Sequence, residues 1–172
     1  MSFLSGKKVK LRPLEKEDVD LLYVIENNPA VWEVSHTLTP YSKTVLQDYI
    51  ASSSADIYTS KQLRLVITTK DGIPVGLIDL FDFDAYHSRV GIGILVVEKE
   101  RSKGYANESL ELLIDYVQFH LGLKQVYCNV TADNCASIKL FEKCEFVKCG
   151  EKKHWIKAKD RWKDEWMYQL LF

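Results

Sequence analysis

The sequence has 172 residues, but it lacks long apolar runs, a large surplus of charge and paired-cysteine motifs. No apolar run approaches the roughly 20 residues of a membrane-spanning helix, which argues against a membrane protein. The early lysines Lys7, Lys8 and Lys10 are not followed by an apolar stretch of signal-peptide length, so we expect a cytoplasmic protein. The formal net charge of -1 argues against a nucleic-acid partner, because nonspecific phosphate binding depends on a basic surplus.

Residues that commonly bind metals are few and scattered. The cysteines are Cys128, Cys135, Cys144 and Cys149, and the histidines are His36, His87, His120 and His154. The cysteines form no Cys-x-x-Cys pair and no zinc spacing, so we expect reduced thiols, mostly small buried side chains, and no metal site. The histidines do not cluster, and each is more typical of a surface or capping position than of a catalyst.

The composition that is present is that of a globular protein. Hydrophobic residues make up 47% and charged residues 27%, which excludes a disordered or fibrous chain. No repeat or low-complexity segment divides the sequence, and the locally loose stretch at 51–55 is too short to separate domains. We therefore expect one domain over residues 1–172.

Hydrophobic periodicity and turn signals predict an alternation of strands and helices. Strands are predicted over 9–12, 63–69, 75–81, 90–97 and 125–131, with two more between 146 and 171. Helices are predicted over 15–26, 42–51, from 106 to the cap at Gly122, and over 134–143. Asp71-Gly72 marks a hairpin turn between two of the strands. This order predicts an α/β fold, a mixed sheet with helices on its faces.

The junction between the strand at 90–97 and the long helix could bind an anion. The first N–H groups of a helix have no internal partners and lie at the positive end of its dipole, so they can hold a pyrophosphate. Gly104 would let a phosphate approach the backbone without a Cβ in the way, and Arg101 and Lys103 add positive charge. Taken alone, these features also fit a solvated loop.

Two motifs carry a family resemblance. Arg101-Ser102-Lys103-Gly104-Tyr105-Ala106 resembles the Arg/Gln-x-x-Gly-x-Gly/Ala coenzyme A signature of the GNAT acetyltransferase superfamily. Downstream, the segment 134–146 resembles the family's Asn-x-x-Ala/Ser-x-x-Leu-Tyr-x-Lys-x-Gly-Phe. The segments 11–14 and 71–76 are similar to the branch that contains spermidine and ribosomal-protein N-terminal acetyltransferases. The two motifs occur in the family's order, and together with the two earlier segments they extend the resemblance over nearly the whole chain.

The resemblance implies a splayed, mostly antiparallel sheet with helices on both faces, and acetyl-CoA as the co-substrate. The splay would lie between the strands at 90–97 and 125–131 and would hold the pantetheine arm. Residues expected to bind the cofactor are Leu95, Val96, Val97, Arg101, Ser102, Lys103, Gly104, Tyr105, Ala106, Asn134 and Ser137. The side chain of Asn134 could equally serve as a helix N-cap.

Some positions depart from the family pattern. Phe141 stands where many relatives have a tyrosine that protonates the leaving thiolate, and a phenylalanine cannot donate a proton. Asn129 and Gly91 stand where relatives place a glutamate base. Glu145 replaces the usual glycine, so we expect an altered turn after that helix.

Several groups are candidates to replace the missing acid and base. Water, Tyr127 or Cys135 could protonate the leaving sulfur. The carboxylates that remain as candidate catalytic groups are Asp79, Asp82 and Asp84. For each of them, a solvated acidic strand end is the alternative interpretation.

The implied reaction is acetylation of a primary amine, and acids near the presumed acceptor side favour a polyamine such as spermidine. These acids are Glu26, Glu33, Asp79, Asp82 and Asp84. A polycation gains from several carboxylates at once, whereas a protein N-terminus needs only one. The alternatives are an N-terminal acetyltransferase for a ribosomal or other protein, and a module that binds acetyl-CoA or a polyamine without turnover. Trp32 and Tyr41 either line the acceptor site or pack in a core, and a homo-oligomer is also left open.

Overall fold

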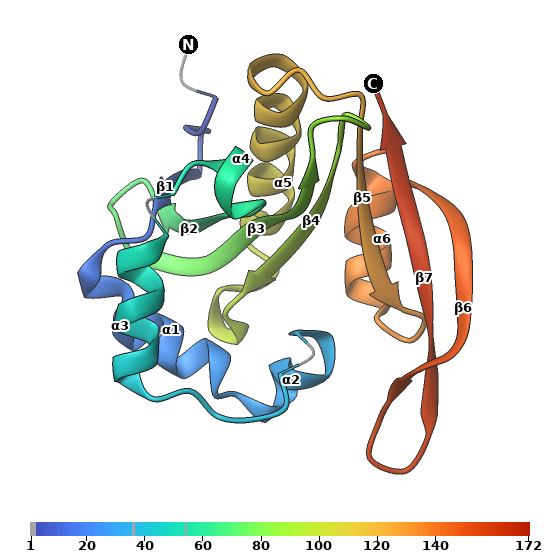
Figure 1. The fold of residues 1–172 in the computed structure, drawn as a ribbon, viewed down its shortest axis with the longest axis horizontal. Helices are drawn as coiled ribbons and strands as arrows, with labels where there is room; N and C mark the ends of the chain where they lie inside the picture. The colour runs from blue at the N-terminus through green and yellow to red at the C-terminus, as the bar shows by residue number, and fades with distance from the viewer. Residues whose placement is uncertain (1–2, 36, 54) are drawn as a thin grey trace.

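The computed structural model describes residues 3–35, 37–53 and 55–172 and arranges them around one seven-stranded sheet (Figure 1). The strand order is β1-β2-β3-β4-β5-β7-β6. The strands are β1 Val9–Pro13, β2 Leu63–Thr69, β3 Pro74–Asp84, β4 Arg89–Val96, β5 Gln125–Thr131, β6 Val147–Lys157 and β7 Trp162–Leu171. Neighbouring strands are antiparallel except β4 and β5, which are parallel. The predicted mixed, mostly antiparallel sheet is confirmed.

The helices predicted from the sequence are present, and two short ones were missed. The helices are α1 Val19–Glu26, α2 Pro29–Ser35, α3 Lys43–Ser52, α4 Ile57–Ser60, α5 Tyr105–Asp115 with a π-helical turn at Tyr116–His120, and α6 Cys135–Lys143. A 3₁₀ turn at Lys16–Asp18 precedes α1. The missed helices are α2, which begins at a proline, and α4, a single turn capped by the side chain of Asp56. His36 lies outside the described residues.

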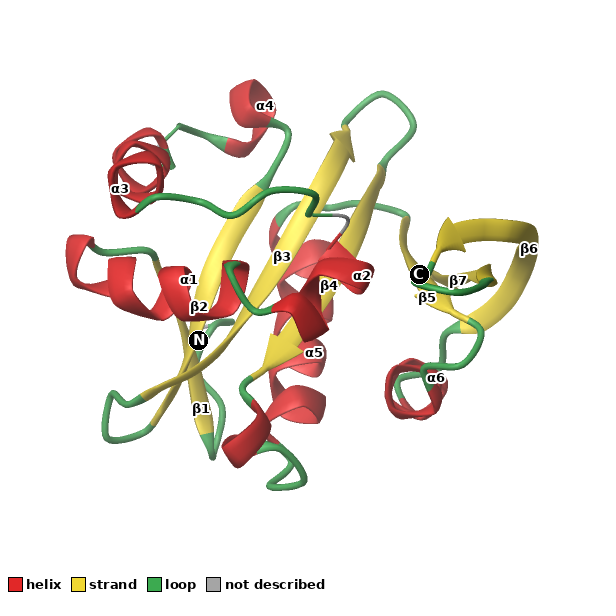
Figure 2. Cartoon of the chain, turned by 90° about the horizontal axis from the view of Figure 1, so that it is seen from below, coloured by secondary structure: helices red, strands yellow, loops and turns green. Residues whose placement is uncertain are grey.

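Helices cover both faces of strands β1 to β4, as predicted (Figure 2). On one face, α1 and α3 pack against Val66 of β2 and Leu77 of β3. On the other face, α5 contributes Leu110 and Leu113 to the larger core. Side chains along β2 and β3 point alternately to the two faces of the sheet. Because helices cover both faces, successive residues are buried and apolar, which explains the nearly continuous hydrophobic runs in these strands.

The sheet divides between β4 and β5, which pair only through Arg89–Gln125, Val90–Val126 and Gly91–Tyr127. Beyond Gly91 the two strands separate, although β4 continues to Val96 and β5 to Thr131. Figure 2 shows β1 to β4 on one side of this division and β5 to β7 with α6 on the other. The predicted splay is therefore confirmed.

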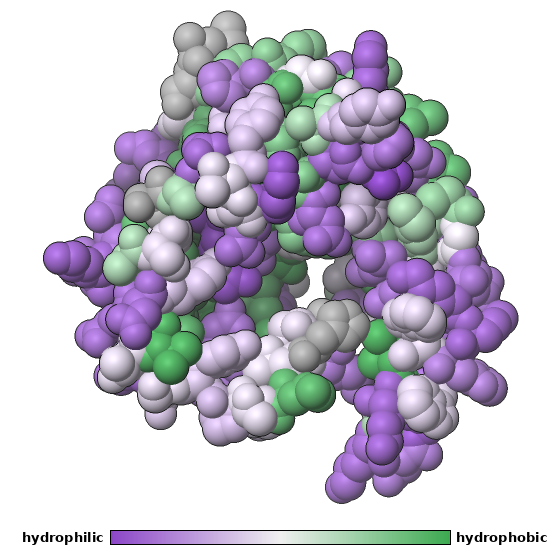
Figure 3. All heavy atoms as spheres, in the orientation of Figure 1, coloured by the Kyte–Doolittle hydropathy of each residue, from purple (hydrophilic) through white to green (hydrophobic). Residues whose placement is uncertain are grey.

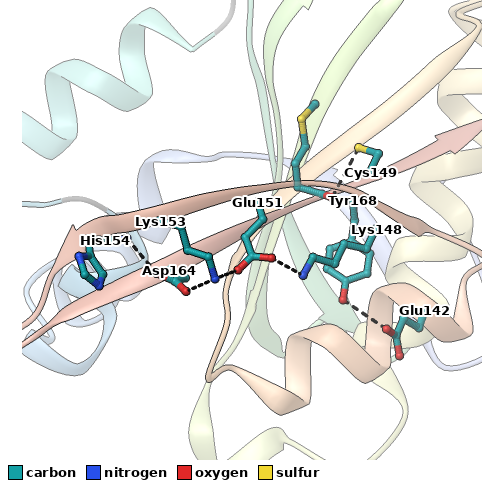
Figure 4. Close-up of polar contacts among 9 residues, drawn as sticks. Glu142, Lys148, Cys149, Glu151, Lys153, His154, Asp164 and Tyr168 are labelled. Carbon is teal, nitrogen blue, oxygen red and sulfur yellow. Dashed lines mark hydrogen bonds and ion pairs between the residues drawn. The ribbon is translucent and has the colours of Figure 1, made fainter.

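Strand β6 forms one edge of the sheet and carries a row of opposite charges (Figure 4). Glu151 lies between Lys148, at 3.1 Å, and Lys153, and Lys153 also pairs with Asp164 of β7 at 2.9 Å. Register shifts interrupt the pairing of β6 with β7 at two places. Charges and bulges on an edge strand oppose its pairing with another sheet, so this surface protects the edge.

Candidate functional site

The separation of β4 and β5 opens a cleft of about 200 Å³ between the two parts of the sheet. Figure 3 shows the surface hollowed between these parts. The cleft is lined by the β4 segment 92–95 and the β5 segment 129–131, by the start of α6, and by side chains from α1, α2, β2, β3 and β7. Its volume is below the roughly 300–1,000 Å³ of pockets for drug-sized ligands, so it has room for a small group or for part of a longer ligand.

The backbone of β4 forms one wall of the cleft. Because β5 pairs with β4 only as far as Gly91, the backbone of the segment 92–95 borders the cleft on that side. Leu95 is part of this wall. Val96 and Val97 lie beyond the lining, where the Val96 carbonyl accepts Arg101 Nε at 3.1 Å and the Val97 N–H donates to a β3 carbonyl at 2.9 Å. Of the three residues predicted to bind the cofactor here, Leu95 borders the cleft, and Val96 and Val97 do not.

The predicted pyrophosphate loop, Arg101–Ala106, forms the turn into α5. Ser102 and Gly104 adopt left-handed conformations with φ of +62° and +85°, and Gly104 is the N-cap of α5. No side chain of the described residues caps this helix end. Lys103 pairs with Glu100 at 2.8 Å. The loop thus presents backbone N–H groups that α5 itself leaves without partners.

An anionic group fits this loop, because its open N–H groups lie at the positive end of the α5 dipole. Gly104 has no Cβ to block an anion, and the flexible end of the Lys8 side chain lies beside it, 2.8 Å from where a Cβ would be. The loop follows the β4 wall directly along the chain, although it does not line the cleft itself. A ligand that joins a pyrophosphate to a slender thioester arm, as acetyl-CoA does, fits the loop and the cleft together.

The start of α6 forms the facing wall through Asn134 and Ser137, both of which line the cleft. The Asn134 side-chain oxygen accepts the Ser137 N–H at 3.2 Å, so the N-cap interpretation is confirmed. The cap lies in the cleft wall, where the predicted cofactor contact would also be made. That contact remains a prediction.

Phe141 lines the cleft one helical turn beyond Ser137 and is 4% exposed. Its ring meets Phe146 edge to face, with centroids 5.1 Å apart. Glu145 has a φ of +67°, and the turn keeps the Phe146 N–H bond to the Phe141 carbonyl and the Glu145 N–H bond to the Glu142 carbonyl, at 3.1 and 3.0 Å. These are the two bonds of a Schellman motif. The expectation of an altered turn was wrong, because Glu145 adopts the left-handed conformation that glycine would take.

Gly91, where relatives place a glutamate, is a glycine for a packing reason. A Cβ at this position would lie 2.2 Å from the Phe81 ring. That ring packs edge-on against Tyr127, with centroids 5.9 Å apart. The aromatic pair fills the space that a glutamate side chain would need, so a base cannot be placed here without moving Phe81.

Asp79 lines the cleft together with Glu26 of α1, and Arg64 of β2 bridges the two. Arg64 donates to Asp79 at 2.6 and 3.2 Å and to Glu26 at 2.7 Å. Burial lowers the pKa of Arg64, but the two carboxylates and nearby Tyr49 raise it by more, so the guanidinium stays charged. Two carboxylates share one guanidinium, which leaves an excess of negative charge at this wall.

The other two predicted carboxylates lie outside the cleft lining. Asp82 accepts a hydrogen bond from the Tyr127 hydroxyl at 3.3 Å. Asp84 accepts the His87 N–H at 2.9 Å and pairs with Arg89 at 3.2 Å. The His87 N–H is the main cause that lowers the pKa of Asp84. The structure therefore does not bring Asp82 and Asp84 together with Asp79 in the cleft.

The remaining predicted alternatives are dispersed. Asn129 lines the cleft, whereas Cys135 is exposed in the first turn of α6 and lies outside the lining. Trp32 and Tyr41 are also outside the lining. The Trp32 indole donates to the Glu26 carbonyl at 2.7 Å, which fastens α2 to the end of α1.

Sequence reasoning missed Glu165 of β7, which lines the cleft together with Glu33 of α2. Glu165 is 4% exposed and pairs with Lys152 at 2.7 Å, and Glu33 contacts Lys163. Side chains alternate along a strand, but the pattern alone does not tell whether Asp164 or Glu165 points inward. The inward acid could therefore not be chosen from the sequence.

The described residues outside the cleft add no second reactive centre of a familiar kind. Within the described ranges, no group of three or more His, Cys, Asp or Glu side chains could hold a metal ion. All four cysteines are free: Cys128 and Cys144 are buried as predicted, whereas Cys135 and Cys149 are exposed, so the expectation of mostly buried thiols was wrong for these two. Burial raises the pKa of the Cys144 thiol to about 11. Among the residues that the structure describes, no helix is long and apolar enough to cross a bilayer.

Comparison with known proteins gives one family. Residues 8–147 match the model of the acetyltransferase (GNAT) domain. The chain is 30% identical over 151 residues to spermidine N(1)-acetyltransferase of Escherichia coli strain K12, covering 87% of this chain and 78% of that protein. A crystal structure of spermidine N-acetyltransferase from Vibrio cholerae in complex with CoA and spermine superposes with a TM-score of 0.87, at 22% identity and 96% coverage of both chains. A dodecameric structure of spermidine N-acetyltransferase from the same organism gives a TM-score of 0.81 at 23% identity, covering 96% of this chain and 95% of that one.

Proposed function

Because the chain belongs to the GNAT acetyltransferase family, we propose that it transfers the acetyl group of acetyl-CoA to a primary amine of a polyamine such as spermidine. The family makes the chain an acyltransferase, and the acceptor is the part that needs support. The convergence of Glu26, Glu33, Asp79 and Glu165 on one cleft carries the proposal. The spermidine acetyltransferase at 30% identity supports the same acceptor.

The charges of the cleft favour a linear polycation over a single amine. The four carboxylates lie in its lining, where Arg64 is bridged between Glu26 and Asp79. Lys152 pairs with Glu165, and Lys163 is shared between Glu33 and Asp133, so these lysines offset part of the charge of the acids. A polyamine laid along the cleft reaches several acids at once, and partly buried charges are screened less by salt than exposed ones.

The reaction forms a bond between the amine nitrogen and the acetyl carbon and breaks the bond from that carbon to sulfur. A primary ammonium, with a pKa of about 10.4, must lose a proton before it can attack. In this proposal Glu26 and Asp79 hold the ammonium, and a water beside them carries its proton away. Backbone N–H groups of the β4 wall would stabilise the oxyanion. Phe141 cannot donate a proton, so the sulfur leaves as a thiolate or takes its proton from water.

Thiol release from acetyl-CoA, measured with spermidine, spermine and butylamine, tests this function. We expect the polyamines to be preferred and the KM for spermidine to rise with salt, because attraction to the acids is screened. Equal use of all three amines without a salt effect would favour a protein N-terminus or another small amine. Binding of CoA without thiol release from any amine would favour a binding module.

Asp79→Asn tests the role of the cleft acids. We expect the KM for spermidine to rise about tenfold, with a smaller effect on butylamine, because one of several charges facing the polycation is removed. Asp48→Asn on α3, an exposed position outside the cleft lining, is the matched control. Thermal unfolding of both variants checks that the Arg64 bridge is not needed for folding. An equal loss for both amines would argue against a polyamine site at Asp79.

We also propose that the chain forms a homo-oligomer. The dodecameric relative has the same fold over 96% of this chain, which supports the proposal. Light scattering in solution tests it, and the mass of a single chain would contradict it. A cytoplasmic location stays a prediction from the sequence.

A further inference from the structure

We propose that Lys8, which the segment before β1 carries to the start of α5, binds the pyrophosphate of CoA. Lys8 lies outside both sequence motifs and far from the loop along the chain. This inference rests on the proposed use of acetyl-CoA but not on the identity of the acceptor. Three observations support it: a fixed backbone, the position of the ammonium, and the charge around it.

The backbone at Lys8 is fastened to the first turn of α5 by Glu108. The two carboxylate oxygens of Glu108 accept the N–H groups of Lys7, Lys8 and Val9 at 2.9, 2.7 and 2.8 Å. Burial alone would raise the pKa of Glu108, but these hydrogen bonds lower it by more, so the carboxylate is ionised at neutral pH. Three hydrogen bonds to one side chain hold the segment in one position beside the helix end.

The ammonium of Lys8 lies directly on the pyrophosphate loop. Its Nζ donates to the Lys103 carbonyl at 3.1 Å. A Cβ at Gly104 would lie 2.8 Å from the same Nζ. The missing side chain of Gly104 therefore admits the Lys8 ammonium as well as a phosphate, and both would meet at the same part of the backbone.

The charge at this position calls for an anion. An ammonium at the N-terminus of a helix faces the positive end of the dipole, which is unfavourable unless negative charge is supplied. The side chains of Arg101 and Lys103 already have partners, the Val96 carbonyl and Glu100. Glu108 supplies one negative charge near Lys8, but its oxygens already accept three N–H groups, and the Lys8 ammonium itself donates to a neutral carbonyl. A pyrophosphate in the loop would give the Lys8 ammonium a charged acceptor and would place further negative charge at the helix end.

Calorimetry of CoA binding to Lys8→Met tests the proposal without any acceptor amine. We expect the Kd for CoA to rise about fivefold, because one exposed charge-assisted contact is lost. Lys8→Arg should recover most of the affinity. Lys10→Met, an exposed lysine of β1 two residues away, is the matched control and should bind CoA as the wild type does. Equal Kd values for wild type and Lys8→Met, with both proteins folded, would overturn the proposal.

Two truncated ligands identify the group that Lys8 contacts. The loss of affinity in Lys8→Met should persist with 3′-dephospho-CoA and disappear with S-acetylpantetheine, which has no pyrophosphate. A loss seen with CoA but not with 3′-dephospho-CoA would overturn the assignment in favour of the 3′-phosphate. A wild-type protein that binds no CoA at all would contradict the proposed function itself, which is a different outcome from equal binding by the two proteins.

Discussion

At the scale of the residue, Glu145 carries a conformational cost that its turn does not require. Its φ of +67° lies in a region that is unfavourable for a residue with a Cβ and freely adopted by glycine. Glu145→Gly removes this cost but adds the larger entropy that glycine loses on folding. The net result should be a rise of roughly 0.5 kcal/mol in the free energy of unfolding. Urea unfolding measures this difference. Glu145→Ala keeps the Cβ, so its free energy of unfolding should not rise. If Glu145→Gly is no more stable than Glu145→Ala, the turn is not strained.

Phe141 combines two roles in one ring, packing against Phe146 and lining the cleft where an acid is missing. If departure of the thiolate limits turnover, Phe141→Tyr should raise kcat by about tenfold or more, because a general acid then assists the step. Steady-state thiol release at saturating substrates measures the change. Phe146→Tyr adds the same hydroxyl to the packing partner, outside the cleft lining, and should not raise kcat. An unchanged kcat with an unchanged KM in Phe141→Tyr would mean that thiolate departure is not limiting.

At the scale of the element, an ion pair fastens β1 to the start of α1. Arg12 donates to both oxygens of Asp18 at 2.6 and 2.8 Å, and Asp18 also accepts the Glu15 N–H at 2.8 Å. Asp18 is 3% exposed. Burial raises the pKa of Asp18, but the hydrogen bonds from Arg12 and Glu15 lower it by more, and the net shift is downward.

The pH dependence of this tie follows from the direction of the shift. Asp18 binds protons more weakly in the folded chain, so its contribution is fully present above its unfolded pKa of about 4 and is lost as the pH falls through the lower folded pKa. Asp18→Asn should cost about 2 kcal/mol at pH 7, because Arg12 loses its charged partner. Urea unfolding at pH 7 and pH 3 should show this difference shrinking in acid. A difference of the same size at both pH values would contradict the assignment to the ionised carboxylate.

At the scale of the whole molecule, the sheet and its main helices were predictable because their signals are local. The Asp71-Gly72 turn defined the hairpin of β2 and β3, and the period of the 106–121 segment defined the long helix. The helices α2 and α4 are too short for a period to appear, and α4 depends on the cap supplied by Asp56. The sequence of a single turn does not distinguish it from a loop.

The cleft was less predictable, because its acids come from segments far apart in the chain. Glu26, Glu33 and Asp79 were named from the sequence, but they could not be separated from Asp82 and Asp84. A register shift interrupts the pairing of β3 with β4 between Phe81 and Asp84, so alternation along the strand no longer tells which side chain faces the cleft. The bridge from Arg64 to Asp79 and Glu26 likewise depends on the packing of α1 on β2 and β3.

Strands β4 and β5 are joined by three residue pairs, so few backbone hydrogen bonds hold the two parts of the sheet together. The two parts also share the larger core, so we expect only the backbone hydrogen bonds of this short seam to open locally at a lower free energy than the core strands. A ligand bound to both walls would bridge β4 and β5 beyond Gly91, where the two strands no longer pair. At a CoA concentration 100 times its Kd, mass action alone would add about 2.7 kcal/mol to the free energy of unfolding. Amide hydrogens along the seam, more than those of β1 and β2, should then exchange more slowly with solvent.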